Sequence, residues 1–248
     1  MPGSFPVAET HFDEWTARNY SRLWPEVFHP DVLDQAVEFL AELAAAGPAL
    51  EFGVGTGRVA IPLARRGMQV SGIELSQAMV DELQRQGAPA VEVIVGDFAT
   101  ASIDRRFTLV YLLRNTITNL TSQDEQVAAF ANAAAHLEPG GCFVIENYIP
   151  KIQHLPPGET RHVFVATADH VGVEEYDLAA QTAVSRHWWL FDGELKTFAS
   201  PHRYVWPSEL DLMAKMAGMT LRERWTDWHR APFTADSPRH VSVWEKPA

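Results

Sequence analysis

The segment LEFGVGTGRV, residues 50–59, places three glycines at alternate positions directly after a short apolar stretch that contains an acid. A strand that runs into closely spaced glycines and then into a helix lets a ligand lie against bare backbone at the start of that helix. Three alternate glycines cost more backbone entropy than a tight turn requires. We therefore expect Gly53, Gly55 and Gly57 to form a ligand-binding turn.

Two classes of ligand that use such a turn fit this segment poorly. A phosphate-binding loop ends in Gly-Lys-Ser/Thr, whereas Gly57 is followed by Arg58 and Val59. The dinucleotide fingerprint has its third glycine at the position that Arg58 occupies here. An NAD(P)-dependent oxidoreductase is therefore the weaker alternative.

The acid before the glycines indicates a ligand that carries an ammonium group. Glu51 precedes Gly53 closely, and its carboxylate would repel a pyrophosphate but attract a cation. A ligand that combines a nucleoside with an ammonium group and has no phosphate is S-adenosylmethionine.

The segment EFGVGTG resembles the glycine motif of class I S-adenosylmethionine-dependent methyltransferases, and the resemblance extends over roughly residues 33–147. In that family an acid at the end of the second strand binds the ribose hydroxyls, which implies this role for Glu74 in GIELS. An acid after the third strand binds the adenine amine, which implies this role for Asp97 in VGDF. The predicted cofactor-binding residues are Glu51, Gly53, Gly55, Gly57, Glu74, Leu75, Asp97, Phe98 and Leu113. The structural alternatives are a solvated strand end for Glu74 and a common turn pair for Gly96 and Asp97.

Strand-like and helix-like segments alternate on both sides of the motif. Helices are expected after an N-cap at Asp31, over 59–66, after an N-cap at Ser76, after a capping box formed by Ser122 and Glu125, and after an N-cap at Ser208. Strands are expected over 49–52, 69–74, 91–95, 107–113, 142–147, 220–225 and 240–246. This order predicts an α/β fold, a Rossmann-like, doubly wound, mostly parallel seven-stranded sheet with helices on both faces.

The alternation stops after Pro150. Residues 161–205 show strand-like pieces, and the pair Asp192-Gly193 is a strong signal for a hairpin turn. We expect an antiparallel β insertion that covers one end of the sheet as a lid. The predicted organisation is a cap segment over 1–30, a methyltransferase core over 31–150 and 206–248, and the substrate lid over 151–205.

Candidates for the methyl-acceptor side follow the fourth strand. Methyl transfer requires alignment and the exclusion of water, and a hydroxyl acceptor also needs a general base. Asn115 and Asn119 are expected to orient the acceptor or the cofactor, although both could simply build the turn. Tyr20 resembles the tyrosine that small-molecule N-methyltransferases of this class place over the cofactor, with a core aromatic as the alternative. His202, beside Arg203 in the insertion, is the fourth catalytic candidate.

The chain is also similar to small-molecule N-methyltransferases that carry an antiparallel lid after the fifth strand, including the sugar-amine enzymes of natural-product pathways. Those sugar enzymes have a serine-rich segment where this chain has RNTITNL, residues 114–120. The expected activity is transfer of a methyl group from S-adenosylmethionine to an N or O atom of a small molecule. A non-catalytic protein that binds S-adenosylmethionine is the second alternative.

Composition limits the partners. The formal net charge of −12 and the absence of any Lys/Arg run longer than two argue against nucleic acid and favour cationic or neutral small substrates. The single cysteine, Cys142, permits no intrachain disulfide, and no metal site is expected. The first fifteen residues do not resemble a secretory signal and no apolar run has the length of a membrane span, so a cytoplasmic monomer or homodimer is expected.

Overall fold

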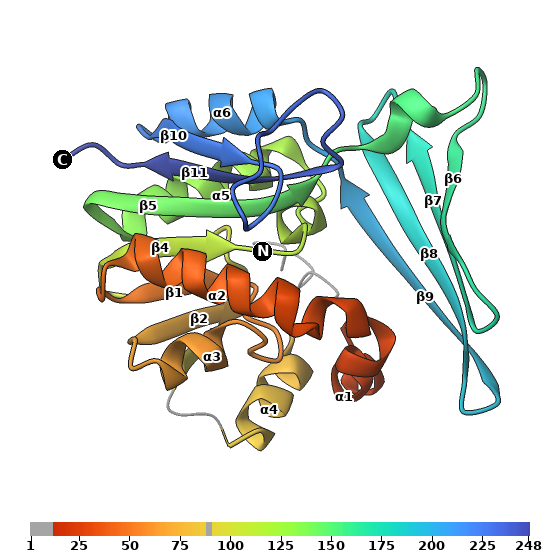
Figure 1. The fold of residues 1–248 in the computed structure, drawn as a ribbon, viewed down its shortest axis with the longest axis horizontal. Coiled ribbons are helices and arrows are strands. Elements are labelled where there is room, and N and C mark those ends of the chain that lie inside the picture. Colours follow the sequence, from red (N-terminus) through yellow and green to blue (C-terminus); the bar gives the residue numbers. More distant parts are fainter. Residues whose placement is uncertain (1–11, 88–90) are drawn as a thin grey trace, which may run out of the picture.

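The computed structural model describes residues 12–87 and 91–248. Seven strands form one sheet in the order β10-β11-β5-β4-β1-β2-β3 (Figure 1). Its parallel part consists of β1 (Ala49–Phe52), β2 (Val70–Glu74), β3 (Glu92–Val95), β4 (Phe107–Leu112) and β5 (Leu137–Tyr148). The two last strands, β10 (Thr220–Trp225) and β11 (Arg239–Glu245), add antiparallel pairs at one edge. The predicted doubly wound, mostly parallel sheet is confirmed.

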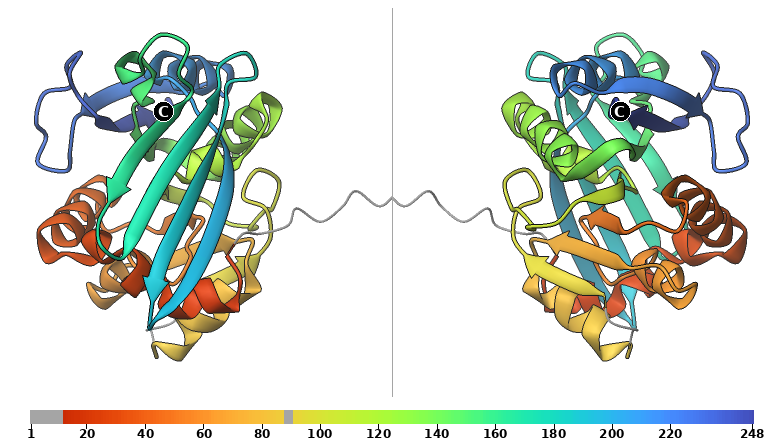
Figure 2. Two further views of the ribbon diagram at one scale, coloured as in Figure 1. Left: turned by 90° about the vertical axis from the view of Figure 1, so that its right-hand side faces the viewer. Right: turned by 90° about the vertical axis from the view of Figure 1, so that its left-hand side faces the viewer.

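Helices cover both faces of this sheet (Figures 1 and 2). On one face, α2 (Pro30–Ala44), α3 (Ala60–Arg65) and α4 (Gln77–Arg85) contribute side chains such as Leu40 and Leu63 to one apolar cluster. On the other face, α5 (Gln123–His136) and α6 (Pro207–Met216) contribute side chains such as Phe130 and Leu210 to a second cluster. Cys142 is a buried member of the first cluster, as its small apolar character suggests.

The helix starts follow capping chemistry, with two differences from the sequence-based prediction. Ser76 caps α4, and Ser122 and Glu125 form the expected capping box of α5. However, α2 begins two residues earlier than predicted, because Pro30 occupies its first position and His29, not Asp31, is the N-cap. In the same way Pro207 starts α6 after Trp206, so Ser208 lies inside the first turn and caps nothing.

A second, antiparallel sheet stands beyond the carboxyl ends of the central strands (Figure 1). It consists of β6 (Arg161–Ala166), β7 (His170–Asp177), β8 (Thr182–Phe191) and β9 (Glu194–Arg203), and we call it the lid sheet. Asp192 and Gly193 both have positive φ, 51° and 83°, as the predicted two-residue hairpin turn requires. The antiparallel insertion expected from the sequence is confirmed.

The N-terminal helix packs against the tip of the lid sheet (Figure 1). α1 (Glu14–Leu23) places Trp15 edge-on to Phe191, with ring centroids 5.2 Å apart. Arg22 Nη2 lies 2.9 Å from Asp192 Oδ1, and its guanidinium also covers the ring of Phe191. The 3₁₀ turn η1 (Pro25–Phe28) then leads into α2. Residues 1–11 of the predicted cap segment lie outside the described residues. Within the described ranges, no helix is long and apolar enough to cross a membrane.

Candidate active site

The glycine turn is built from residues in the left-handed region of the backbone. Gly53, Gly55 and Gly57 have φ values of 68°, 54° and 81°. A Cβ added at Gly55 would meet nothing within 4 Å, because this residue faces an open cavity. A Cβ at Gly57 would instead lie 2.8 Å from Ile61 Cδ1, and Gly57 is not part of the cavity wall. The structure therefore separates a cavity-facing glycine at 55 from a packing glycine at 57.

A cavity of about 380 Å³ lies at this turn. It opens beyond the carboxyl ends of β1 and β4, where the strand order changes direction, which is the usual ligand site of such sheets. The sequence-predicted residues in its wall are Tyr20, Glu51, Gly53, Gly55, Glu74, Leu75, Asp97, Phe98, Leu113 and Asn119. Residues that are distant in the chain are thus brought to one place by the topology.

Glu51 is a buried acid in the wall of this cavity. It pairs with Tyr111 across β1 and β4, and the Tyr111 hydroxyl donates a hydrogen bond to Glu51 Oε2 at 3.0 Å. Burial raises the pKa of Glu51 to about 8, although the nearby Arg58 guanidinium and the Tyr111 hydroxyl act in the opposite direction. A ligand ammonium group beside Glu51 would favour its charged form.

Glu74 links the glycine turn to the next helix. Its Oε2 accepts a hydrogen bond from Gly55 N at 2.9 Å, and its Oε1 accepts one from Ser76 N at 2.9 Å. Burial raises the pKa of this carboxyl, while the backbone donors act against the shift. Each carboxylate oxygen keeps a further lone pair, so Glu74 can also accept hydrogen bonds from two ligand hydroxyls.

Asp97 and Phe98 form another part of the same wall. Asp97 Oδ1 accepts a hydrogen bond from Ala99 N at 2.8 Å, which fixes the carboxyl after β3. Phe98 stacks on Phe52 with ring centroids 5.6 Å apart and an interplanar angle of 22°. An acid beside a fixed aromatic ring suits a planar base that carries an amine.

The wall also contains residues that were not among the predicted ligands. Arg58 lines the cavity and donates a hydrogen bond to Val27 O at 3.1 Å. Thr56, Met79 and Pro201 line it as well. Pro201 comes from the lid sheet, so no local pattern around the glycine motif could have indicated it.

A second, larger cavity of about 490 Å³ lies between the lid sheet and the core. Five residues line both cavities, so the two adjoin: Phe12, Tyr20, Arg114, Thr116 and Asn119. Tyr20 reaches the junction from α1, with its ring 4.9 Å from that of Trp24. Three of the four catalytic candidates, Asn115, Asn119 and His202, come to the same cavity as Tyr20.

Asn115 shapes the loop after β4. Its φ is 61°, and its Oδ1 accepts a hydrogen bond from Tyr148 N at 2.8 Å. Its side chain therefore has a structural partner in the neighbouring strand. Asn119 ends the 3₁₀ turn η2 (Thr116–Asn119) and lies at the junction of the cavities.

His202 on β9 contacts the same turn. Its Nδ1 lies 3.1 Å from Thr118 Oγ1, and this hydroxyl lies 2.7 Å from the carbonyl oxygen of Asn115. Because the carbonyl can only accept and is the nearer group, we assign the Thr118 proton to it. His202 Nδ1 then donates to Thr118, and the unprotonated nitrogen of this tautomer is Nε2.

Two further histidines in the wall of the larger cavity contact each other. His170 Nε2 lies 2.9 Å from His187 Nδ1, and His187 stacks on Trp189 at a centroid distance of 4.7 Å. Burial lowers the pKa of His187 to about 4 and also lowers that of His170. Both imidazoles are therefore neutral at pH 7.

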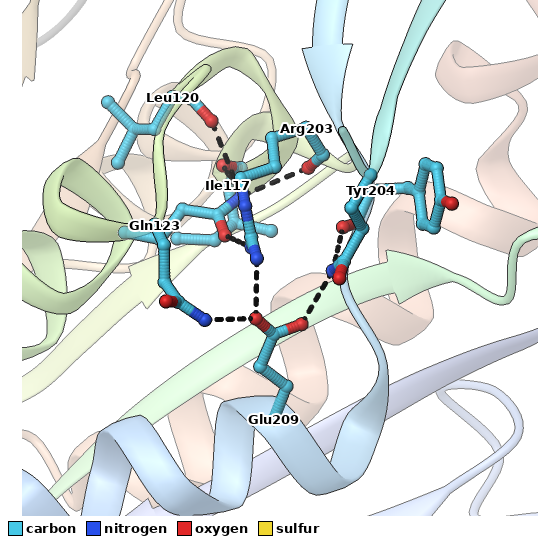
Figure 3. Close-up of polar contacts among 8 residues, drawn as sticks. Ile117, Leu120, Gln123, Arg203, Tyr204 and Glu209 are labelled. Atoms are coloured by element: carbon cyan, nitrogen blue, oxygen red, sulfur yellow. Dashed lines mark hydrogen bonds and ion pairs between the residues drawn. The ribbon is translucent and has the colours of Figure 1, made fainter. Parts of the chain in front are cut away.

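A polar network fixes the lid sheet to the loop that carries the site (Figure 3). The side-chain amide of the fully buried Gln126 donates hydrogen bonds to the carbonyl oxygens of Ile117, Leu120 and Arg203. Arg203 Nη2 lies 2.7 Å from Glu209 Oε1, and Glu209 also accepts hydrogen bonds from Gln123 and Gln181. The network thereby joins α5, α6, η2 and the end of β9.

The described ranges contain no group of three or more His, Cys, Asp or Glu side chains that could hold a metal ion. The residues of the smaller cavity do fit S-adenosylmethionine. A Cβ at Gly55 would project into open cavity, and three acids, Glu51, Glu74 and Asp97, line the same wall. The ammonium group, ribose hydroxyls and adenine amine of this cofactor are donors that suit such acids. Fold and site together define a methyltransferase that depends on this cofactor.

Comparisons with known proteins agree with the assignment as a methyltransferase. Residues 49–141 match the family model described as a methyltransferase domain. The structure of the CcbJ methyltransferase from Streptomyces caelestis is 40% identical, with a TM-score of 0.78, and the match covers 86% of this chain and 89% of that one. This chain therefore belongs to the S-adenosylmethionine-dependent methyltransferases.

More distant relatives share the core or the fold. A dTDP-3-amino-3,6-dideoxy-alpha-D-glucopyranose N,N-dimethyltransferase from Streptomyces fradiae is 33% identical over 119 residues, which are 48% of this chain and 46% of the relative. The matched segment thus spans about half of that curated relative's length. CalS10 with bound S-adenosylmethionine, an amino pentose methyltransferase from Micromonospora echinaspora, shares the fold at 19% identity and a TM-score of 0.69, over 96% of this chain and 98% of that one.

Proposed function

We propose that this protein transfers a methyl group from S-adenosylmethionine to a nitrogen atom of a small molecule held in the larger cavity. The observation that carries the proposal is the shared wall of the two cavities, because a methyl donor and its acceptor must meet at such a junction. The names of the relatives favour nitrogen over oxygen, since the Streptomyces fradiae protein is an N,N-dimethyltransferase of an amino sugar. The net charge of −12 also favours a cationic or neutral acceptor over nucleic acid.

The protein's part in the reaction is mainly binding and alignment. When bound, the cofactor supplies a methyl group on a positively charged sulfur, which is already activated for displacement. We propose that Glu51, Gly55, Glu74, Asp97 and Phe98 hold the cofactor, with Leu75 and Leu113 as apolar contacts. Gly53 forms the same turn, and Gly57 contributes through packing. Tyr20 and Asn119 would orient the acceptor at the junction and exclude water from it.

A nitrogen acceptor that binds as an ammonium must lose one proton before transfer. An amine attacks through its lone pair, which the ammonium form lacks. We propose that His202 Nε2 takes this proton, because the contact of Nδ1 with Thr118 leaves Nε2 unprotonated. Asn115 acts as a positioning residue, since its carbonyl fixes Thr118 and its side chain fixes Tyr148.

The test is the release of S-adenosylhomocysteine with a panel of cyclic amines, each paired with the matching alcohol. Mass spectrometry of the products should show one added methyl group on nitrogen. Methylation of the alcohols in preference to the amines would contradict the proposal. Binding of the cofactor without release on any acceptor would favour the non-catalytic alternative.

His202→Asn tests the proton acceptor. We expect kcat to fall about 100-fold or more, which is the lower range for loss of a general base, and the low-pH limb of the pH–rate profile to disappear. The affinity for the cofactor should not change, because His202 is not part of the smaller cavity. A variant with wild-type kcat and pH profile would show that His202 has no role in the reaction.

The cytoplasmic location and the oligomeric state expected from the sequence stay predictions.

A further inference from the structure

The lid sheet presents a polar surface to the larger cavity. Along β7, alternate side chains point inward, and these include His170, Glu174 and Tyr176, while Glu175 lies on the outer face. His170 and Glu174 line the cavity directly, whereas Tyr176 is buried behind them. The fold therefore places the acidic side chain of Glu174 in the wall of the larger cavity.

Hydroxyl groups hold the Glu174 carboxylate in place. The Tyr176 hydroxyl donates to Oε2 at 2.6 Å, the Ser185 hydroxyl donates to Oε1 at 3.2 Å, and the Tyr148 hydroxyl lies 3.5 Å from Oε1. Burial, and after it the charge of Glu174, raises the pKa of Tyr148 and that of Tyr176. Both phenols therefore stay protonated and keep donating. The carboxylate retains lone pairs that these donors do not use.

Among the described residues, Glu174 is not part of an ion pair within 4 Å, although Lys151 and His162 line the same cavity and His162 lies opposite Glu174 on β6. Among the ion pairs of residues 12–87 and 91–248, the other cavity acid, Glu26, pairs with Arg114 at 3.2 Å, but none includes Glu174. Its neighbour on β7, His170, is neutral at pH 7 because burial lowers its pKa. A fixed carboxylate that has no ion pair among the described residues favours a ligand group that donates hydrogen bonds.

Glu174 does not lie at the junction of the two cavities. It lines only the larger one, and Tyr148 separates it from the cofactor side, because Tyr148 contacts Asn115 through its backbone and Glu174 through its hydroxyl. The ligand group that reaches Glu174 is therefore distinct from the nitrogen that would be methylated.

We propose that Glu174 is a specificity-determining residue that binds a second hydrogen-bond-donating group of the acceptor, remote from the reacting nitrogen. The acceptor class is accordingly a bifunctional amine whose second group is a hydroxyl or an ammonium. This inference rests on the proposed function only for the identity of the cavity, and binding measurements can test it without turnover.

Three matched probes separate the possibilities: cyclohexylamine, trans-4-aminocyclohexanol and trans-1,4-diaminocyclohexane. Their affinities are measured by ligand-observed NMR on the complex of the protein with S-adenosylhomocysteine. Wild-type protein should bind at least one bifunctional probe about tenfold or more tightly than cyclohexylamine, as expected for a hydrogen bond to a charged group. Equal affinity for all three probes, or no binding of any of them, would overturn the proposal.

Variants then identify the residue and the second group. Glu174→Ala should abolish the preference for the bifunctional probe. Glu174→Gln keeps an acceptor oxygen but loses the charge, so it should retain a preference for the amino alcohol and lose one for the diamine. The matched control is Glu175→Gln, which alters the outward neighbour, paired with Arg161 at 2.9 Å, and should leave the preference unchanged. A preference that survives in Glu174→Ala would overturn the assignment.

Loss of folding is monitored separately. Glu174→Ala leaves the buried Tyr176 hydroxyl without its acceptor, so the affinity for S-adenosylhomocysteine at the other cavity serves as the folding control. If the probes bind as expected but none is methylated, the proposed function fails while the role of Glu174 in binding stands.

Discussion

Gln126 and Arg203 are hydrogen-bonded to each other twice. The side-chain amide of Gln126 donates to the carbonyl oxygen of Arg203 at 3.0 Å, and the Arg203 guanidinium donates back to Gln126 Oε1 (Figure 3). The two residues belong to α5 and to the last position of the lid sheet. Because Gln126 also holds the carbonyls of Ile117 and Leu120, this reciprocal pair positions the lid sheet and the η2 turn relative to each other.

Gln126→Leu should loosen the contact between the lid sheet and the η2 turn. The change removes one donor from each of three carbonyl groups and the acceptor of the buried Arg203 guanidinium, so we expect the free energy of unfolding to fall by about 2–4 kcal/mol. The value of kcat should fall more than the affinity for the cofactor, because η2 borders the junction of the cavities. Chemical denaturation and steady-state kinetics measure the two effects.

Gln123→Leu is the control for that substitution. Gln123 is exposed and donates one hydrogen bond to Glu209, so its loss should change stability by less than about 1 kcal/mol. Equal effects of the two substitutions would show that the buried pair has no special role.

Glu51→Gln tests the ammonium site and its pH dependence. The pKa of about 8 means that Glu51 is mainly protonated at pH 7, and a bound ammonium group requires the charged form. The affinity of wild-type protein for S-adenosylmethionine should therefore rise with pH up to about 8, and binding should release a proton. The variant should bind more weakly and lose this rise. Calorimetry in buffers of different ionisation enthalpy measures both, and a pH-independent affinity of the wild type would exclude Glu51 as the partner of the ammonium.

Gly55→Val should abolish binding of the cofactor. The added side chain would enter the smaller cavity, since nothing lies within 4 Å of a Cβ at this position. The positive φ of 54° adds backbone strain of order 1 kcal/mol. Gly87→Val is the matched control, because Gly87 has a φ of 60° and equally open surroundings but lies outside the cavity wall. Calorimetric titration should show normal affinity for the control alone.

His240→Gln should reduce the acid sensitivity of the fold. His240 is fully buried on β11, and burial, aided by Arg224, lowers its pKa to about 3. The unfolded chain binds a proton near pH 6.5 whereas the folded one does not, so this residue contributes stability above pH 6.5 that is lost as the pH falls towards 3. The difference in stability between variant and wild type should therefore change by about 1.4 kcal/mol per pH unit in this window. Urea denaturation at several pH values checks the slope, and parallel curves would contradict it.

The sequence predicted the core of the fold because its signals are local. The glycine turn, the caps at Ser76 and Ser122 and the Asp192-Gly193 turn each depend on a few adjacent residues, and the structure confirms them as local features. The caps at Asp31 and Ser208 were wrong for a local reason as well, because a neighbouring proline takes the first helical position in each case.

The larger cavity could not be predicted from local sequence signals. Both faces of the lid sheet are mixed: His187 and Glu174 face inward beside the buried Trp189 and Tyr176, while Trp188 and Leu190 are exposed on the outer face. Because apolar side chains lie on both faces, the alternation of apolar and polar residues does not identify the face that lines the cavity. Contacts such as those of Glu174 with Tyr148, or of Gln126 with Arg203, depend on the packing of distant segments and have no counterpart in a sequence motif.

The helix α1 contributes to the walls of both the smaller and the larger cavity. Its Tyr20 faces each of them, and its Arg22 and Trp15 fasten it to the far tip of the β8–β9 hairpin. Arg203 anchors the opposite end of that hairpin to α6. Displacement of α1 would therefore remove the Tyr20 part of the wall from the smaller and the larger cavity together. We expect a covalent link between positions 22 and 192, which would hold α1 to the tip of the hairpin, to slow ligand exchange in both cavities.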